Sequence, residues 1–432
     1  MLAVVLGVAG CSLAFVCSSS ADWSAPQKLA SSRVWSYARP VLASDTAGDA
    51  IVGWHRENEL NETLSGIEAS IRPRRALWSP PVVLTATRQG GAYAPQVSIG
   101  PDGNAAAVWH GLARLEAATR PAAGTWSRPS AISRRTEELD GAATAALAVD
   151  ARGGVKAVFD SRQGRLFTIE LASRGPHGGW QAPRKLAASR YPLQEPQIET
   201  DARGETLIAW VRGGPRPRVQ SLVLGANGKA NRPAQTVASG KGRLRELHLA
   251  VNAGGEAILL WRLQVGRRSS SEVARRSAGA RFTRAVVVAR EDDSELTGTI
   301  DARGEAIVLF THTSPGQVKA VEAATARPRA RWSTPVPLAP GRETAEPQIG
   351  ADPSGGAAVA AWTAGRFGSH TGAIEASARN PQGGWQTPIV VSGLGGFSPS
   401  IVVNANGKAT AAWIGEAPAA SGVEAIETAD FE

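Results

Sequence analysis

The chain has 432 residues, of which 43% are hydrophobic and 20% charged, and it contains 47 glycines and 27 prolines. This apolar content excludes a disordered chain, and the many glycines and prolines favour short strands joined by turns over long helices. The net charge is +9, but the basic residues are dispersed, so nucleic acid is not an expected partner and anionic partners such as acidic glycans or envelope polymers are favoured.

The first 21 residues differ from the rest of the chain. They are apolar, then small and polar, and no charge precedes Asp22. We therefore predict a signal peptide at 1–21 and a single exported domain at 22–432, secreted or attached to a bacterial cell envelope. The segment Val8-Ala9-Gly10-Cys11 resembles a lipoprotein box, which would make Cys11 the lipid-bearing residue and a lipid anchor the only membrane contact. Both cysteines lie in this segment, so the mature domain has no disulfide or thiolate site.

The remaining chain is built from a repeat of about 50 residues. In most units an Asp-x-x-Gly turn is followed by a strand of small residues that ends in Trp or Phe, and Asn252 and Asn404 replace the Asp in two units. In such a turn the Asp carboxylate accepts backbone N–H bonds and the glycine adopts a positive φ. The turn glycines are Gly48, Gly103, Gly153, Gly204, Gly255, Gly304, Gly355 and Gly407. A second marker, Trp-Ser/Gln-x-Pro, begins at Trp23, Trp78, Trp126, Trp180, Trp332 and Trp385, and Asn231 and Phe282 take its place in the two other units.

Each unit predicts four short strands. In the unit around Gly204 they cover 196–200, 206–210, 219–224 and 234–237. The chain opens with one lone strand from Trp23 and ends with three, at 400–403, 409–413 and 422–428. This arrangement predicts an all-β fold, a β-propeller of eight four-stranded blades in which the N-terminal strand completes the last blade.

The unit Pro-x-Val/Ile-x-x-Asp-x-x-Gly-x-Ala-x-x-x-Trp resembles the repeats of secreted bacterial propellers related to the NHL and BNR/sialidase-like groups, over residues 23–428. The resemblance implies the fold, whereas propellers host unrelated functions. A sialidase would need an arginine triad, a Tyr–Glu nucleophile pair and an acidic proton donor. Nothing in the sequence pairs Tyr37, Tyr93 or Tyr191 with a glutamate, and the spacing from Asp201 through Gly204 to Trp210 departs from the sialidase Asp-box. No catalytic residue is assigned, and no cofactor or metal is expected, because the acidic stretch 291–295 lacks a calcium-loop spacing.

The predicted topology brings the loops before each innermost strand and after each Trp strand to one face. These loops concentrate aromatic, arginine, histidine and aspartate side chains, which suit the binding of a sugar or peptide. The predicted binding residues are Arg33, Trp35, Tyr37, His55, Arg56, Arg88, Tyr93, His110, Asp160, Arg162, Arg190, Tyr191, Arg212, Arg262, His312, Arg342 and Arg366.

The function expected from these features is a monomeric binding module for a glycan, a peptide or an envelope protein. One alternative is a sialidase-like carbohydrate-active enzyme, a hydrolase or lyase. A second alternative is a non-catalytic scaffold. A pair of carboxylates over the channel beside arginines favours the enzyme, and a shallow aromatic face favours binding.

Overall fold

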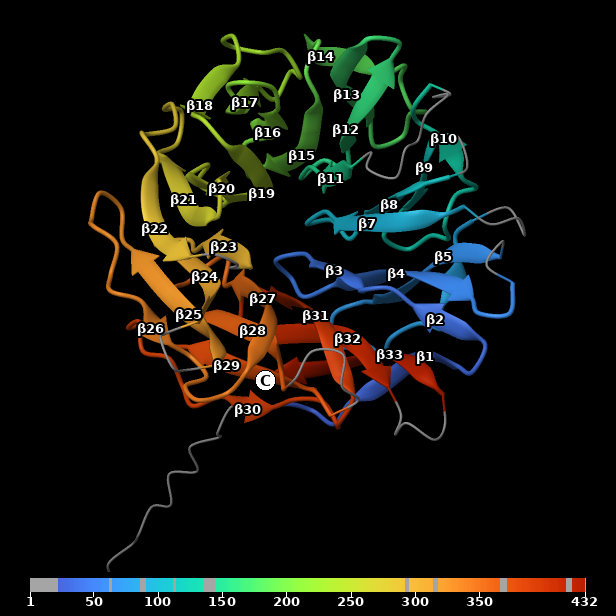
Figure 1. The fold of residues 1–432 in the computed structure, drawn as a ribbon. Helices are drawn as coiled ribbons and strands as arrows, with labels where there is room; N and C mark the ends of the chain where they lie inside the picture. Colours follow the sequence, from blue (N-terminus) through green and yellow to red (C-terminus); the bar gives the residue numbers. More distant parts are fainter. Residues whose placement is uncertain are drawn as a thin grey trace, which may run out of the picture.

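The computed structural model describes residues 22–61, 64–85, 91–111, 114–134, 144–291, 295–313, 318–365, 371–416 and 422–431. All regular secondary structure in these ranges is β-strand, arranged in eight antiparallel sheets that surround a central axis like the blades of a propeller (Figure 1). The predicted eight-bladed propeller is therefore confirmed. None of the described residues form a helix long and apolar enough to cross a membrane.

Each blade runs from an innermost strand at the axis to an outermost strand at the perimeter (Figure 1). Blade 1 contains β2 (Trp35–Tyr37) and β3 (Val41–Ser44), which both pair with β4 (Ala50–Asn58), then β5 (Ser65–Arg72) and β6 (Val82–Val83). Blade 2 contains β7 (Tyr93–Ile99), β8 (Ala105–His110), β9 (Leu115–Arg120) and β10 (Ser130–Ala131). Blade 3 contains β11 (Ala145–Val149), β12 (Val155–Gln163), β13 (Leu166–Arg174) and β14 (Arg184–Ser189). Blade 4 contains β15 (Leu193–Thr200), β16 (Thr206–Arg212), β17 (Arg218–Leu224) and β18 (Gln235–Ser239).

The second half of the ring follows the same plan. Blade 5 contains β19 (Arg243–Val251), β20 (Ala257–Val265), β21 (Arg268–Arg276) and β22 (Val286–Glu291). Blade 6 contains β23 (Leu296–Ile300), β24 (Ala306–Thr313), β25 (Lys319–Ala326) and β26 (Val336–Pro337). Blade 7 contains β27 (Thr344–Ala351), β28 (Ala358–Ala364), β29 (Ala373–Arg379) and β30 (Ile389–Val390). Blade 8 contains β31 (Gly396–Val403), β32 (Ala409–Glu416), β33 (Glu424–Phe431) and, at the perimeter, β1 (Gln27–Ser32).

The N-terminal strand closes the ring as predicted. Strand β1 pairs antiparallel with β33, with Gln27 opposite Thr428 and Ser32 opposite Glu424. Trp23 extends this pairing, because its ring lies 5.5 Å from that of Phe431. The first and last strands of the described chain thus share one blade, which covers an edge of β33 that would otherwise be unpaired.

The core lies between neighbouring blades, and the residue that ends the repeated Trp strand is central to it. The side chains of Trp54, Trp109, Trp210, Trp261, Trp362 and Trp413 are fully buried, as are Phe159 and Phe310, which replace Trp in blades 3 and 6. The second strand of each blade is buried on both faces because it packs against the blades on either side, which explains its apolar and alanine-rich sequence.

Two details of the repeat differ from the prediction. Seven of the eight turn glycines have a positive φ, but Gly355 does not, because the turn of blade 7 is one residue longer. There Asp352 N donates to Ala357 O, whereas Asp201 N donates to Glu205 O four residues on. The assignment of Asn231 to the Trp position was also wrong, because Ala230 bridges to Leu224 just as Trp385 bridges to Arg379. The position of the next proline agrees with this register, because Pro233 comes three residues after Ala230 and Pro388 three residues after Trp385.

Candidate binding face

The innermost strands begin, and the second strands end, at one side of the ring, here called the loop face. Strand register shows this directly, because Tyr93 lies opposite His110 and Leu193 opposite Arg212. The Asp-x-x-Gly turns lie at the other ends of the same strands, here called the turn face. The loops named in the sequence prediction therefore do share one face.

Blades 1 and 2 place an aromatic ring beside a basic or imidazole side chain on the loop face. In blade 1 the Arg56 guanidinium lies 4.5 Å from the Trp35 ring centroid and forms an ion pair of 2.6 Å with Glu68. In blade 2 the Tyr93 and His110 rings stack at 4.9 Å with an interplanar angle of 13°. Stacking of this kind fixes the orientation of both rings.

Blades 3 and 4 repeat the arrangement with different residues. Arg162 lies 5.5 Å from the ring of Phe167, a residue that the sequence prediction did not include. Arg212 lies 5.2 Å from the ring of Tyr191, which is 39% exposed. The Tyr191 ring also lies against the backbone of Gly214, where φ is +101° and a Cβ atom would come within 2.7 Å of the ring. A glycine is required at that position for both reasons.

Hydrogen bonds link several neighbouring blades at the mouth of the channel on the loop face. They involve residues that lie just before the buried start of an innermost strand, and we call the eight residues at this position the mouth belt. They are Arg39, Ala94, Thr144, Glu195, Glu246, Glu295, Glu346 and Ser398. Glu195 Oε2 accepts from Leu247 N at 2.8 Å, and Glu346 Oε2 accepts from Ser398 N at 2.8 Å, so each carboxylate ties one blade to the next.

Backbone geometry directs these side chains. Ala94, Glu195, Glu246, Glu346 and Ser398 have φ between 50° and 56°, and each lies where the strand register shifts at a β-bulge. Non-glycine residues rarely adopt this conformation, and a bulge re-aims the side chain it carries. The sequence prediction mentioned some of these glutamates as loop residues but could not identify the belt.

Arg39 spans part of the mouth. Its Nη2 lies 2.9 Å from Glu346 Oε1, which joins blade 1 to blade 7 past the intervening blade 8. Its charge also acts on His248 of blade 5, since burial and the Arg39 charge together lower the pKa of that imidazole to about 4. The surrounding protein raises the pKa of the Glu199 carboxyl to about 7 by desolvation, although this side chain on the innermost strand β15 is solvent-accessible. The innermost strands thus carry polar groups whose proton affinity the fold has shifted.

Asp160 is the predicted residue with the most developed surroundings. Its Oδ1 accepts from Thr144 N at 2.6 Å and from Thr144 Oγ1 at 3.1 Å, and the same hydroxyl accepts from Glu195 N at 3.1 Å. Burial, with a smaller contribution from the Glu195 charge, raises the pKa of Asp160 to about 6. Burial and the charge of Glu246 raise the pKa of Glu195 as well. Two carboxyl groups with raised pKa values, one in blade 3 and one in blade 4, therefore lie at the mouth. In blade 5 Arg262 pairs with Glu246 at 3.0 Å.

Several predicted residues do not join this arrangement. Arg33 and Arg190 are exposed, and Arg342, also exposed, forms an ion pair with the buried Glu375. Tyr37 is buried, its backbone N donates to Glu424, and burial raises the pKa of its hydroxyl to about 12. Burial lowers the pKa of the half-buried His55.

His312 is also half-buried. The remaining predicted positions, Arg88, Arg366 and Cys11, lie outside the described residues, as do Asp292 and Asp293 of the acidic stretch. Among the residues that are described, no group of three or more His, Cys, Asp or Glu side chains could hold a metal ion.

One hydrogen bond that recurs around the ring was not predicted from the sequence. The indole Nε1 of the repeated Trp donates to an acidic or amide side chain directly opposite on the third strand, as Trp54 does to Glu68 and Trp261 to Glu272, both at 3.0 Å. The residues at this position are Glu68, Glu116, Glu170, Gln220, Glu272, Glu322, Glu375 and Glu427. These residues recur at the repeat period, and this recurrence could have predicted the contact, because a polar residue inside an otherwise apolar strand needs a buried partner.

No protein-family model matches the sequence, and no curated protein matches it. Solved structures do resemble it. The BP39L lectin from Burkholderia pseudomallei is 15% identical, with a TM-score of 0.54 over 83% of this chain and 100% of the lectin chain. An ulvan lyase is 11% identical over 76% of this chain and 90% of its own, with a TM-score of 0.49. The arabinofuranosidase Arb93A from Fusarium graminearum is 12% identical over 69% of this chain and 96% of its own, with a TM-score of 0.39. At these identities the likeness to the lectin extends to the propeller fold alone.

Proposed function

We propose that the chain is a binding module that holds a glycan on its loop face. The observation that carries this proposal is the series of aromatic rings in blades 1 to 4, each placed against an Arg or His on the loop face. The same face carries the mouth-belt carboxylates of blades 4 to 7. A sugar ring presents apolar C–H groups on its faces and hydroxyls at its edges. An aromatic ring suits the first, and carboxylates and guanidinium groups suit the second.

The fold is compatible with this function without deciding it. A lectin shares the propeller architecture, but propellers host many activities, so the site has to carry the argument. The basic net charge of +9 adds support for an acidic glycan. A peptide or an envelope protein is the alternative occupant of the same face, and a scaffold without a small ligand is the third possibility.

A second candidate function is cleavage of a carbohydrate. It is favoured by the carboxyl groups of Asp160 and Glu195, whose residues are linked through the Thr144 hydroxyl. A carboxyl whose pKa is raised to about 6, as in Asp160, keeps a proton that it can donate near neutral pH. In this alternative Asp160 is the proton donor, and the enzyme is a sialidase-like glycosidase or a lyase.

The remaining elements of the proposal concern the setting of the protein. We place it outside the cell or on the cell envelope, with residues 1–21 as a signal peptide and a lipid on Cys11 as the possible anchor. We also propose that it acts as a monomer, and that its relatives are propellers of the NHL and BNR/sialidase-like groups.

A single experiment separates binding from cleavage. The 22–432 domain is incubated with a mixed glycan library, and mass spectrometry reports both retained and cleaved species. Retention without cleavage supports the binding module. Cleavage that is lost in Asp160→Asn supports the enzyme, whereas a library left neither bound nor cut moves the assignment to a protein partner.

Variants locate the site. Tyr191→Ala is expected to weaken retention about tenfold, because the exposed ring and its cation neighbour Arg212 would no longer form a stacking surface. The control is Lys28→Ala on the perimeter strand β1, where the side chain is 61% exposed and should not affect retention. Equal retention by both variants would remove the loop face from the proposal.

A further inference from the structure

A separate cavity of about 280 Å³ lies toward the turn face, in the cleft between blades 4 and 5. Blade 4 contributes Glu205, Val223 and Arg232 to its lining, and blade 5 contributes Arg276, Arg281 and Phe282. Glu205 directly follows an Asp-x-x-Gly turn, at the far end of β16 from the loop-face residue Arg212. The cavity is thus distinct from the site described above.

A departure from the repeat helps to explain why there is room here. Trp126, Trp180 and Trp332 pack against the core that their blade shares with the preceding one. In blade 5 the same position holds Phe282, which packs against the shared core of blades 4 and 5. A phenyl ring occupies less of the cleft than an indole does, so part of the space that Trp fills elsewhere is left open.

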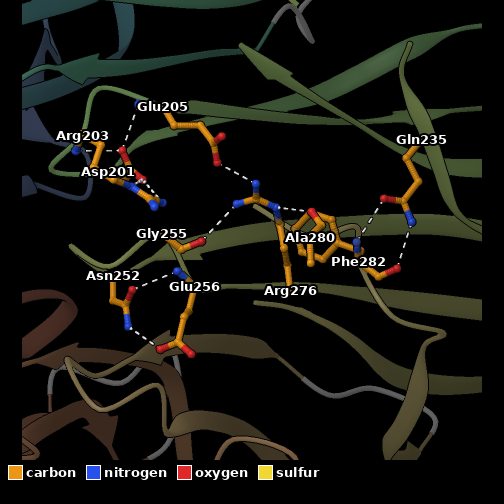
Figure 2. Close-up of polar contacts among 10 residues, drawn as sticks. All are labelled: Asp201, Arg203, Glu205, Gln235, Asn252, Gly255, Glu256, Arg276, Ala280 and Phe282. Atoms are coloured by element: carbon orange, nitrogen blue, oxygen red, sulfur yellow. Dashed lines mark hydrogen bonds and ion pairs between the residues drawn. The ribbon is translucent and has the colours of Figure 1, made fainter. Parts of the chain in front are cut away.

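Hydrogen bonds hold the lining residues Arg276 and Phe282 in place (Figure 2). The buried Arg276 donates from Nη2 to Glu205 Oε1 at 2.6 Å, from Nη1 to Gly255 O at 3.0 Å and from Nε to Ala280 O at 2.9 Å. Gln235 clamps the Phe282 backbone in both directions, accepting from its N–H at 3.0 Å and donating to its carbonyl at 2.9 Å. The site is therefore preorganised, which lowers the cost of ordering it around a ligand.

The polar groups at the cavity define the ligand chemistry. Arg276 neutralises Glu205, which leaves the exposed Arg232 and Arg281 as net positive charge. Within the continuously described range 144–291, Glu205 Oε2 accepts no hydrogen bond, and this side chain is 20% exposed, so it can receive one from a ligand hydroxyl. The Val223 and Phe282 side chains supply apolar surface. A ligand that matches all three features has an apolar ring face, a hydroxyl group and a carboxylate.

We propose that this cleft binds a hexuronic acid residue, with its carboxylate between Arg232 and Arg281 and a hydroxyl on Glu205. A neutral hexose lacks the carboxylate. An aromatic carboxylate without hydroxyls leaves the Glu205 oxygen without a donor, which is costly for a partly buried acceptor. The proposal is independent of the glycan site on the loop face.

The test uses the 22–432 domain with glucuronic acid as the probe and glucose as the neutral match, followed by calorimetric titration and saturation-transfer NMR. Glucuronic acid is expected to bind saturably and at least tenfold more tightly than glucose. Arg232→Ala and Arg281→Ala should each weaken it about tenfold, the effect of losing one charge-assisted hydrogen bond. Phe282→Trp restores the residue that most other blades carry and should abolish binding by filling the cleft while the fold is kept.

Controls distinguish this site from the loop face. Lys28→Ala on the perimeter strand β1 should leave glucuronic acid binding unchanged. A loss of binding in Tyr191→Ala equal to that in Arg232→Ala would move the bound acid to the loop face and overturn the proposal. The proposal also fails if glucuronic acid does not bind, or if it binds equally well to the wild type and to Phe282→Trp. Far-UV circular dichroism of each variant verifies that loss of binding is not loss of fold.

Discussion

Replacing Asp160 by Asn is expected to stabilise the folded propeller at neutral pH. The folded-state pKa of Asp160 is about 6, against a reference value of 3.8, because burial penalises its charged form. An Asn side chain keeps an oxygen that can accept the bonds now donated by Thr144 N and Oγ1. It removes the charge and its repulsion from Glu195, and it replaces the second carboxylate oxygen with an amide N–H donor.

The magnitude follows from the pKa shift. A shift of about 2 units corresponds to about 3 kcal/mol, the largest stabilisation that removal of the charge can give. The sign is set by proton binding. Between about pH 4 and pH 6 the unfolded state releases the Asp160 proton before the folded state does, so the stability of the wild type falls relative to the variant as pH rises. Above pH 6 both states are ionised and the difference is constant.

The assay is urea unfolding of wild type and Asp160→Asn, followed by tryptophan fluorescence at intervals from pH 4 to pH 8. Asp150 at the start of the same hairpin is the control, because its pKa is shifted the other way. Burial would raise the pKa of Asp150, but the hydrogen bond and charge of Lys156, at 3.0 Å, together with the backbone hydrogen bonds from Arg152 and Gly154, outweigh it and lower the pKa. Asp150→Asn should therefore destabilise at pH 7, by an amount that shrinks as pH falls. If the Asp160→Asn difference stays constant from pH 4 to pH 8, or grows toward low pH, the account of Asp160 is wrong.

Three further predictions concern stability, each measured by urea unfolding at pH 7. Trp261→Phe should cost about 2 kcal/mol, because Glu272 loses the indole donor at 3.0 Å, and adding Glu272→Leu should recover part of that loss. Glu205→Gln should cost about 2 kcal/mol, less than the roughly 3–5 kcal/mol typical of a broken buried ion pair, because Arg276 keeps two carbonyl acceptors. An unchanged stability would show that this ion pair does not hold blades 4 and 5 together. Gly407→Ala should cost about 1 kcal/mol through its φ of +72° alone, whereas Gly175→Ala, with open space and no positive φ, should be neutral within about 0.5 kcal/mol.

The architecture could be predicted because its determinants are local and repeated. The Asp-x-x-Gly turn and the closing Trp each act within one hairpin or one cleft, so a period of about 50 residues reports them directly. The two errors of register occurred where a unit departs from the consensus. At Gly355 the extra residue of the turn changes which backbone groups pair. At Ala230 a small residue stands where the repeat otherwise has Trp, and Asn231 was assigned to that position instead.

The sequence could predict where the binding face lies, but not which side chains contact one another on it. Alternation of strand direction places Tyr93 and His110 at the same end of blade 2, but only the strand register brings their rings together. Contacts between blades are harder still to predict from the sequence. Arg39 and Glu346 are 307 residues apart, and no local pattern in either segment indicates the other.

The mouth belt contains internal evidence that its contacts matter. In blade 7 the belt residue is the acid Glu346, and it accepts from Thr363, which follows the repeated Trp. In blade 3 the two roles are exchanged, because the belt residue is Thr144 and the position after the repeated aromatic residue holds the acid Asp160. Packing alone would not require this exchange, since the aromatic residue fills the cleft in either case. A donor–acceptor pair is kept in both blades although the residues have swapped strands, and the exchange leaves a second carboxylate, with a raised pKa, beside Glu195. This carboxylate lowers the stability of the fold, so its retention is explained if the charge serves a function. The stability gained in Asp160→Asn measures that cost.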